Sequence, residues 1–133
     1  MKMIGQGFSA CFKEFFMKLQ TLIDYGSTKK GVTQEFPFDD TTLVFKVMGK
    51  MFALVNLDPP HSVNLKCDPI YAIALRQKYK GVQAGYHMNK RHWNTVDLEA
   101  DYDDNELCAW IDDSYHLVIK GLTRAKRDRL NSL

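Results

Sequence analysis

The side chains best suited to chemistry lie in one short stretch of the sequence, where basic, amide and aromatic residues follow one another. Its members are Tyr86, His87, Asn89, Lys90, Arg91, His92 and Trp93. Lysine and arginine pair with phosphate groups, whereas rings and amides stack on or hydrogen-bond to bases. The stretch therefore predicts a binding site, and one predicted partner is DNA. Lys46, Asn64 and Lys66 occupy alternate positions of predicted strands and can share a sheet face with it.

A structural interpretation of the same stretch stays open. Trp93 and Tyr86 are equally well explained as core residues, with the polar residues between them holding a turn. His87 and His92 flank that turn, and two imidazoles with a carboxylate can hold zinc. No residue at ligand spacing supplies the third group, however. We therefore expect neither a metal nor another cofactor.

Catalytic motifs are missing from the sequence. Cys67 lies just before a predicted helix start, where a helix dipole can lower a thiol pKa. Strand alternation instead places its side chain with Val63 and Leu65, which favours a packing role. The sequence contains no G-x-S-x-G, glycine-rich phosphate loop or dinucleotide fingerprint. We expect a protein without enzymatic activity and assign no catalytic residue.

Length and composition indicate one folded domain in the cytoplasm. The chain has 133 residues, of which 45% are hydrophobic and 26% charged, as in ordinary globular proteins. No apolar run approaches the roughly 20 residues of a membrane span, and charged residues interrupt the N-terminus where a signal peptide would need an apolar stretch. Three scattered cysteines, Cys11, Cys67 and Cys108, are typical of a reducing compartment.

Charge is distributed unevenly along the chain. Residues 97–113 contain eight acids and no lysine or arginine, whereas residues 120–133 contain five bases and one acid. The overall charge is only +2, which argues against strong non-specific binding to DNA. Such segregation can steer a partner or couple segments within the fold.

Hydrophobic periodicity and turn signals predict the elements that position these residues. Apolar spacing of three and four, with capping residues, predicts helices at 8–26, 69–81 and 103–122, followed by a short basic turn at 123–130. Alternation predicts strands at 42–48, 51–57, 62–67, 82–88 and 92–99. The order α-β(3)-α-β(2)-α, with two hairpins, indicates an α+β fold whose mostly antiparallel five-stranded sheet carries packed helices.

Several segments together resemble the MmcQ/YjbR family of small bacterial proteins. They are EFPF at 35–38, TLVFKV at 42–47, VNLKCDP at 63–69, GYHMNK at 85–90, HWNTV at 92–96 and IDDSY at 111–115. The resemblance covers about residues 17–130 and implies the same element order, with a fold similar to type III secretion chaperones. The family is also described as CyaY-like or "double wing", a shape from which DNA binding has been suggested. The resemblance implies no catalytic residue.

The resemblance also divides the chain and leaves two kinds of partner open. Family members usually begin near the position of Met17, so residues 1–16 form an expected N-terminal helical extension to a domain at 17–133. Within it, Phe8, Phe12, Phe15 and Phe16 make an apolar stripe that would pack on the domain or serve a protein partner or homodimer. The expected function is a binding module for DNA through the second hairpin, for a protein in the manner of a chaperone, or for a small ligand.

Overall fold

A six-stranded antiparallel sheet organises the molecule. The computed structural model describes residues 18–85, 88–100 and 102–133, so the expected extension at 1–16, with its phenylalanine stripe, lies outside the described residues. The strands are β1 (Val32–Glu35), β2 (Thr42–Val47), β3 (Lys50–Asn56), β4 (Ser62–Lys66), β5 (Val82–Ala84) and β6 (Trp93–Asp97). They lie in the order β1-β2-β3-β4-β6-β5, and each pairs antiparallel with its neighbour.

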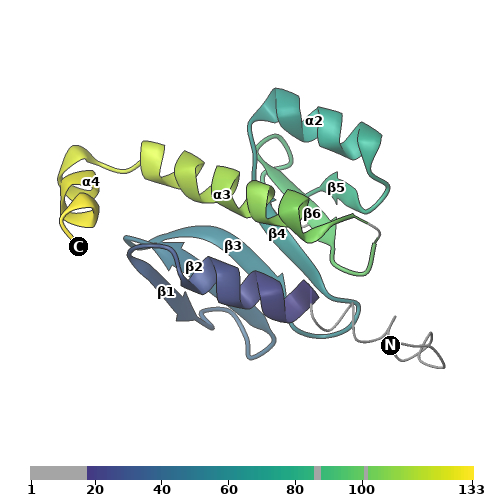
Figure 1. Ribbon diagram of the computed structural model, residues 1–133, viewed down its shortest axis with the longest axis horizontal. Helices are drawn as coiled ribbons and strands as arrows, with labels where there is room; N and C mark the ends of the chain where they lie inside the picture. Colours follow the sequence, from purple (N-terminus) through teal and green to yellow (C-terminus); the bar gives the residue numbers. More distant parts are fainter. Residues whose placement is uncertain (1–17, 86–87, 101) are drawn as a thin grey trace, which may run out of the picture.

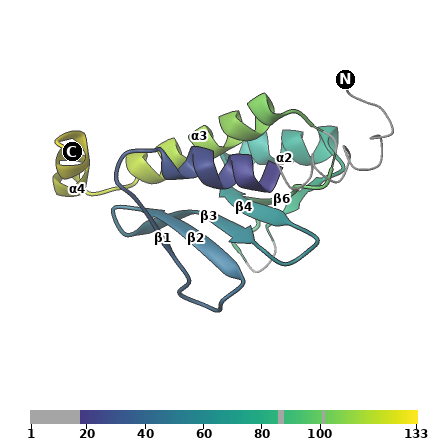
Figure 2. The same cartoon turned by 60° about the horizontal axis from the view of Figure 1, so that its bottom comes forward.

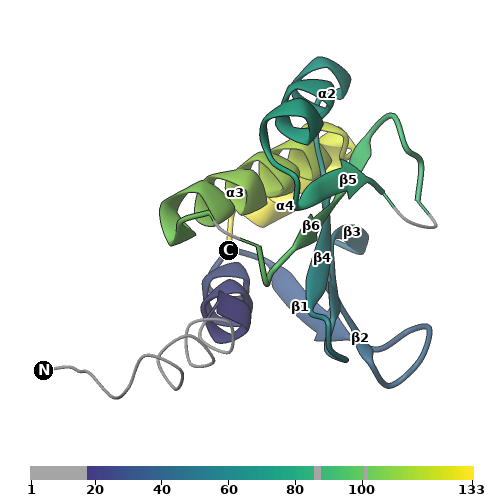
Figure 3. The same cartoon turned by 90° about the vertical axis from the view of Figure 1, so that its right-hand side faces the viewer.

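Three helical segments cover one side of this sheet. They are residues 18–27, α2 (Pro69–Lys78) and α3 (Asp104–Lys120), and the short α4 (Arg124–Asn131) follows at the end of the chain. Figure 1 shows α3 crossing the strands, and Figure 2 shows the helices gathered on the same side of the sheet. In Figure 3, α3 lies between α2 and the segment 18–27. The opposite side of the sheet carries none of these helices.

The predicted α+β class and antiparallel sheet are confirmed, with one strand more than expected. The additional strand, β1, has the sequence VTQE and only its first residue is partly buried. It lacks the apolar alternation by which strands are recognised, so only its pairing with β2 reveals it. The second hairpin has shorter strands than predicted, since β5 ends at Ala84 and β6 begins at Trp93.

The buried face of α3 is the one predicted from its periodicity. Leu107, Trp110, Ile111, Ser114, Tyr115 and Val118 are all buried. The hydroxyl of Ser114 donates to the carbonyl of Phe52 at 2.6 Å and accepts from the backbone amide of Lys66 at 2.8 Å. This one side chain therefore ties α3 to two central strands, and the rings of Phe52 and Tyr115 pack edge-on, with centroids 5.3 Å apart.

Helix starts agree with prediction, whereas the end of α2 does not. The Asp68 carboxylate accepts from the amides of Ile70 and Tyr71, with Pro69 in the first turn, as expected for an N-cap. The helix was expected to reach Gly81 in a left-handed conformation. It ends at Lys78 instead, and Gly81 is needed because a Cβ there would lie 2.5 Å from the Cβ of Ala100.

Two other glycines have positive φ and shape the end of the sheet. Gly49, with φ 84°, and Met48, with φ 52°, form the β2–β3 turn, in agreement with the predicted hairpin. Gly31 has φ 75°, and a Cβ there would lie 2.5 Å from Leu130 of α4. Leu130 is buried in the main core, so α4 is packed onto the domain. None of the described helices is long and apolar enough to cross a membrane.

Candidate functional site

Strand register builds rows of side chains on the face of the sheet without helices. Leu54 of β3 lies opposite Asn64 of β4, and Asn64 lies opposite Thr95 of β6. Thr95 in turn lies opposite Gln83 of the edge strand β5. A second row runs beside this one and consists of Thr42, Asn56 and Ser62. Because side chains alternate along each strand, both rows point away from the main core.

These rows form the floor of a groove of about 690 Å³. Its lining residues are Phe38, Thr42, Met51, Leu54, Asn56, Ser62, Asn64, Gln83, Ala84, Met88 and Thr95. None of them carries a charge. Apolar and hydrogen-bonding side chains are present in similar numbers, so these residues offer both kinds of contact but no cation for a phosphate.

The apolar part of the groove adjoins a second, small core. Val44, Leu54 and Trp93 are buried together on this face, and Met51 and Met88 pack against them. Phe38 stands at the rim and is 64% exposed. Methionine side chains adapt to irregular shapes, so this part of the groove suits an apolar group of variable outline.

The polar part contains amides that retain hydrogen-bonding capacity. The Thr95 hydroxyl donates to Oδ1 of Asn64. Asn56 is engaged locally, since its Nδ2 donates to the carbonyl of Pro60 at 3.3 Å. Within the described part of the chain, Nδ2 of Asn64 donates to no acceptor and the exposed Gln83 amide has no side-chain hydrogen bond. A ligand can therefore bind both amides without breaking a contact.

Two of the residues first singled out around the second hairpin, Asn89 and Lys90, make contacts that hold the connection between β5 and β6 in shape. Oδ1 of Asn89 accepts from the amide of Arg91 at 2.9 Å, and the Lys90 ammonium donates to the carbonyl of Gly85 at 3.3 Å. Arg76 of α2 donates to the backbone carbonyl of Lys90. Tyr86 and His87 lie outside the described residues. The turn interpretation thus accounts for Asn89 and for much of Lys90.

The structure separates the remaining candidates. Lys66, Asn89, His92 and Trp93 line an open depression of about 410 Å³ together with Lys120 of α3. The exposed Arg91 side chain makes no hydrogen bond or ion pair among the described residues. Lys46 lies in β2, which β3 separates from β4, and its ammonium forms an ion pair with Glu35 of β1 at 3.2 Å. Asn64 belongs to the groove.

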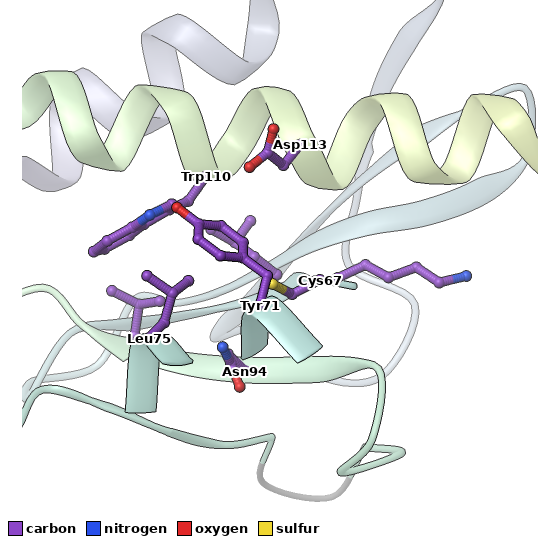
Figure 4. Close-up of a pocket in the computed structure, with 9 residues that line it drawn as sticks. Cys67, Tyr71, Leu75, Asn94, Trp110 and Asp113 are labelled. Atoms are coloured by element: carbon purple, nitrogen blue, oxygen red, sulfur yellow. The ribbon is translucent and has the colours of Figure 1, made fainter. Parts of the chain in front are cut away.

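A small pocket between α2, α3 and the sheet contains Cys67, and the pocket itself leaves no space for a substrate. Figure 4 shows Tyr71, Trp110 and Asp113 around the thiol, and the cavity measures about 10 Å³, roughly the space for one water. Cys67 also lines an open depression of about 350 Å³, together with Asp68, Asp113 and His116. Burial raises the pKa of Cys67 to about 11, so the thiolate is scarce. Burial also raises the pKa of Asp113, and Asp112 raises it further. Across the described residues, no cluster of histidine, cysteine and acidic side chains could hold a metal.

A charged cluster on the helix side of the sheet has a structural role. Lys29 forms an ion pair with Asp112 of α3, and the Tyr25 hydroxyl donates to the same carboxylate at 2.8 Å. Burial opposes ionisation of Asp112, but the hydrogen bonds from Lys29 and Tyr25 outweigh it and lower its pKa. The hydrogen bond to Asp112, with burial, raises the pKa of Tyr25 to about 12. The cluster fastens the segment 18–27 and the following turn to α3.

Comparison with known proteins identifies relatives along most of the chain. A family model described as YjbR matches residues 27–117. The protein YbdF of Escherichia coli O157:H7 is 40% identical over 95 residues, which are 71% of this chain and 76% of that protein. The protein YjbR of Escherichia coli strain K12 is 32% identical over 118 residues, which are 88% of this chain and 100% of that protein.

Solved structures of similar proteins share the fold. The crystal structure of the Deinococcus radiodurans protein DR2400, with a domain described as DUF419, has a TM-score of 0.78 and 38% identity, covering 83% of this chain and 85% of that chain. A Pseudomonas syringae protein has a TM-score of 0.65 and 29% identity, covering 74% of this chain and 96% of that chain.

Proposed function

This chain belongs to the YjbR family, and from that premise we propose that it is a binding protein for a neutral, partly apolar small molecule. The ligand occupies the groove on the helix-free face of the sheet. One observation carries the proposal: the groove of about 690 Å³ has no charged lining residue among those described.

The size and the chemistry of the groove both support a small molecule. Ligand sites commonly measure about 300–1,000 Å³ and combine apolar walls with a few placed polar groups. A charged ligand would lose hydration on entering without meeting a counter-charge among the described lining residues, which is unfavourable. Leu54 and Met51 supply apolar contact, while Asn64 and Gln83 supply hydrogen bonds.

A fragment screen by ¹H–¹⁵N correlation spectroscopy tests the proposal. The library contains equal numbers of neutral and charged fragments, and the full chain is used at neutral pH. We expect mostly neutral fragments among the hits, with shifts in the amides of Leu54, Asn64 and Thr95. Hits that perturb only Lys66, His92 and Lys120, or the absence of any shift in the groove, would overturn it. Self-association through the helix-free face would also contradict the proposal. It would be detected as a molecular mass that rises with protein concentration in light scattering.

Nucleic-acid binding remains a second candidate, supported by a different surface. The open depression gathers Lys66, His92 and Lys120, and Arg91 beside it is exposed, so its guanidinium is available to phosphate. The chain's net charge of +2 and the acids of α3 weaken the attraction.

A salt titration distinguishes this second candidate from the first. Binding of a fluorescent DNA duplex by fluorescence anisotropy should weaken steeply as salt rises, and Arg91→Glu should weaken it further. Lys46→Glu is the matched control, because Lys46 lies away from the depression. No salt-sensitive change in anisotropy, or equal losses in the two variants, removes this candidate.

A further inference from the structure

The groove changes in character along one row of side chains. From β3 to β5, the row reads Leu54, Asn64, Thr95 and Gln83. Its β3 end is apolar and is extended by Met51 and the neighbouring Val44. Its other end consists of amide and hydroxyl groups. A molecule lying across the strands therefore meets hydrocarbon at one end and hydrogen-bonding groups at the other.

The orientation of the Asn64 amide follows from its neighbour. Because the Thr95 hydroxyl donates to Oδ1 of Asn64, the amide oxygen is engaged and Nδ2 is the end of the amide left for a ligand. Nδ2 is then a donor with no acceptor among the described residues. A partly buried donor of this kind gains about 1 kcal/mol from a hydrogen bond to a ligand carbonyl.

Gln83 adds an adaptable group two strands away in the same row. Its amide is exposed and presents both a donor and an acceptor. A carboxamide or lactam also presents both, so it can accept from Asn64 and exchange hydrogen bonds with Gln83. A carboxylate can only accept, and it would bring a charge into a groove without counter-charge.

On the basis of the proposed function, we infer that the ligand is a neutral carboxamide or lactam with an apolar substituent. Its carbonyl accepts a hydrogen bond from Nδ2 of Asn64, and its apolar part lies over Leu54 and Met51. The row of four side chains from Leu54 to Gln83 thus sets the direction of the ligand across the strands.

Two matched probes test this inference. 4-Phenylbutanamide and 4-phenylbutanoate have the same apolar part and differ only in the amide or carboxylate. Each is titrated into the full chain and followed by ¹H–¹⁵N shifts. We expect the amide to bind about tenfold more tightly, which corresponds to one good hydrogen bond. Asn64→Leu should weaken binding of the amide about tenfold, because the ligand carbonyl loses its donor Nδ2. Gln34→Leu on β1, outside the groove, is the control and should retain both the affinity and the preference.

The possible failures are distinguishable. Equal affinity of the two probes at the groove, or an unchanged affinity of Asn64→Leu for the amide, overturns the assignment of the amide but leaves groove binding in place. If neither probe moves the amides of Leu54, Asn64 and Thr95, while the neutral members of the fragment screen also leave them unmoved, groove binding itself is wrong. A folded Asn64→Leu variant is verified by its unchanged shifts in α3.

Discussion

The hydroxyl of Thr95 donates a hydrogen bond to Oδ1 of Asn64 across the β4–β6 pair, on the face of the sheet that the helices leave uncovered. The bond engages the amide oxygen of Asn64 and leaves Nδ2 to meet a ligand. It also places the donor at the middle of a row that is apolar on one side and polar on the other. The helix-free face of the sheet therefore has an apolar end and a polar end, and these ends define how a ligand is oriented across the strands.

A negative charge in the groove should weaken binding of a neutral ligand. Gln83→Glu replaces an amide by an acceptor-only carboxylate, so we expect roughly tenfold weaker binding of 4-phenylbutanamide, the effect of about 1–3 kcal/mol for one mismatched hydrogen bond. Gln34→Glu makes the same change on β1, outside the groove, and should bind as the parent does. Comparable losses in both variants would indicate a general charge effect rather than a contact in the groove.

The ion pair between Lys29 and Asp112 should make stability sensitive to acid. The pKa of Asp112 is lower in the folded protein than its ordinary value, so its stabilising effect is complete above the unfolded pKa of about 3.9. The effect is lost as pH falls through the folded pKa. We expect Asp112→Asn to lower the midpoint of thermal unfolding by a few degrees at pH 7. Near pH 2 the midpoints of the variant and the parent should be nearly equal. The exposed Asp40, changed to asparagine, is the control. If the midpoint of Asp112→Asn stays equally far below that of the parent at low pH, the stabilisation does not come from the ion pair.

Two glycine substitutions should separate backbone strain from packing of α4. Gly31 and Gly49 both have positive φ, so alanine at either costs about 1–2 kcal/mol through the backbone. Only at Gly31 does the added methyl group overlap Leu130, whereas nothing lies within 4 Å at Gly49. Gly31→Ala should therefore be the more destabilising variant in urea unfolding. Equal free energies of unfolding for the two variants would mean that α4 is not packed there.

The buried thiol of Cys67 should be inert in the folded protein. With a pKa of about 11, roughly one molecule in a thousand carries the thiolate at pH 8. In a variant with Cys11→Ser and Cys108→Ser, Ellman's reagent should react slowly until denaturant is added. A variant that retains only the partly exposed Cys108 provides the comparison and should react faster. Rapid native reaction of Cys67 would reopen a nucleophilic role.

Helix starts and the buried face of a helix could be predicted from the sequence, because each depends on a few residues that are close together in the chain. Asp68 with Pro69, and Asp103 with Glu106, each place a helix start. The spacing of Leu107, Trp110 and Val118 identified the buried face of α3, since a helix repeats every 3.6 residues.

Features that depend on pairing between distant strands could not be predicted in the same way. β1 has almost no apolar alternation, and its antiparallel pairing with β2 is what makes it a strand. The groove was missed for a related reason. Thr42, Ser62 and Thr95 are ordinary outward-facing strand residues when considered singly, and only the register places them together. Asn89 and Lys90 were predicted as binding residues from their types alone, whereas their contacts stabilise the connection between β5 and β6.

Crystals of the full chain soaked with a neutral fragment that binds in solution give the most direct measurement of where a ligand lies. The predicted result is electron density across β3, β4 and β6, in contact with Leu54 and within hydrogen-bonding distance of Nδ2 of Asn64. Density confined to the depression beside Lys66 and Lys120, with the helix-free groove empty, would contradict the assignment of this face as the binding site.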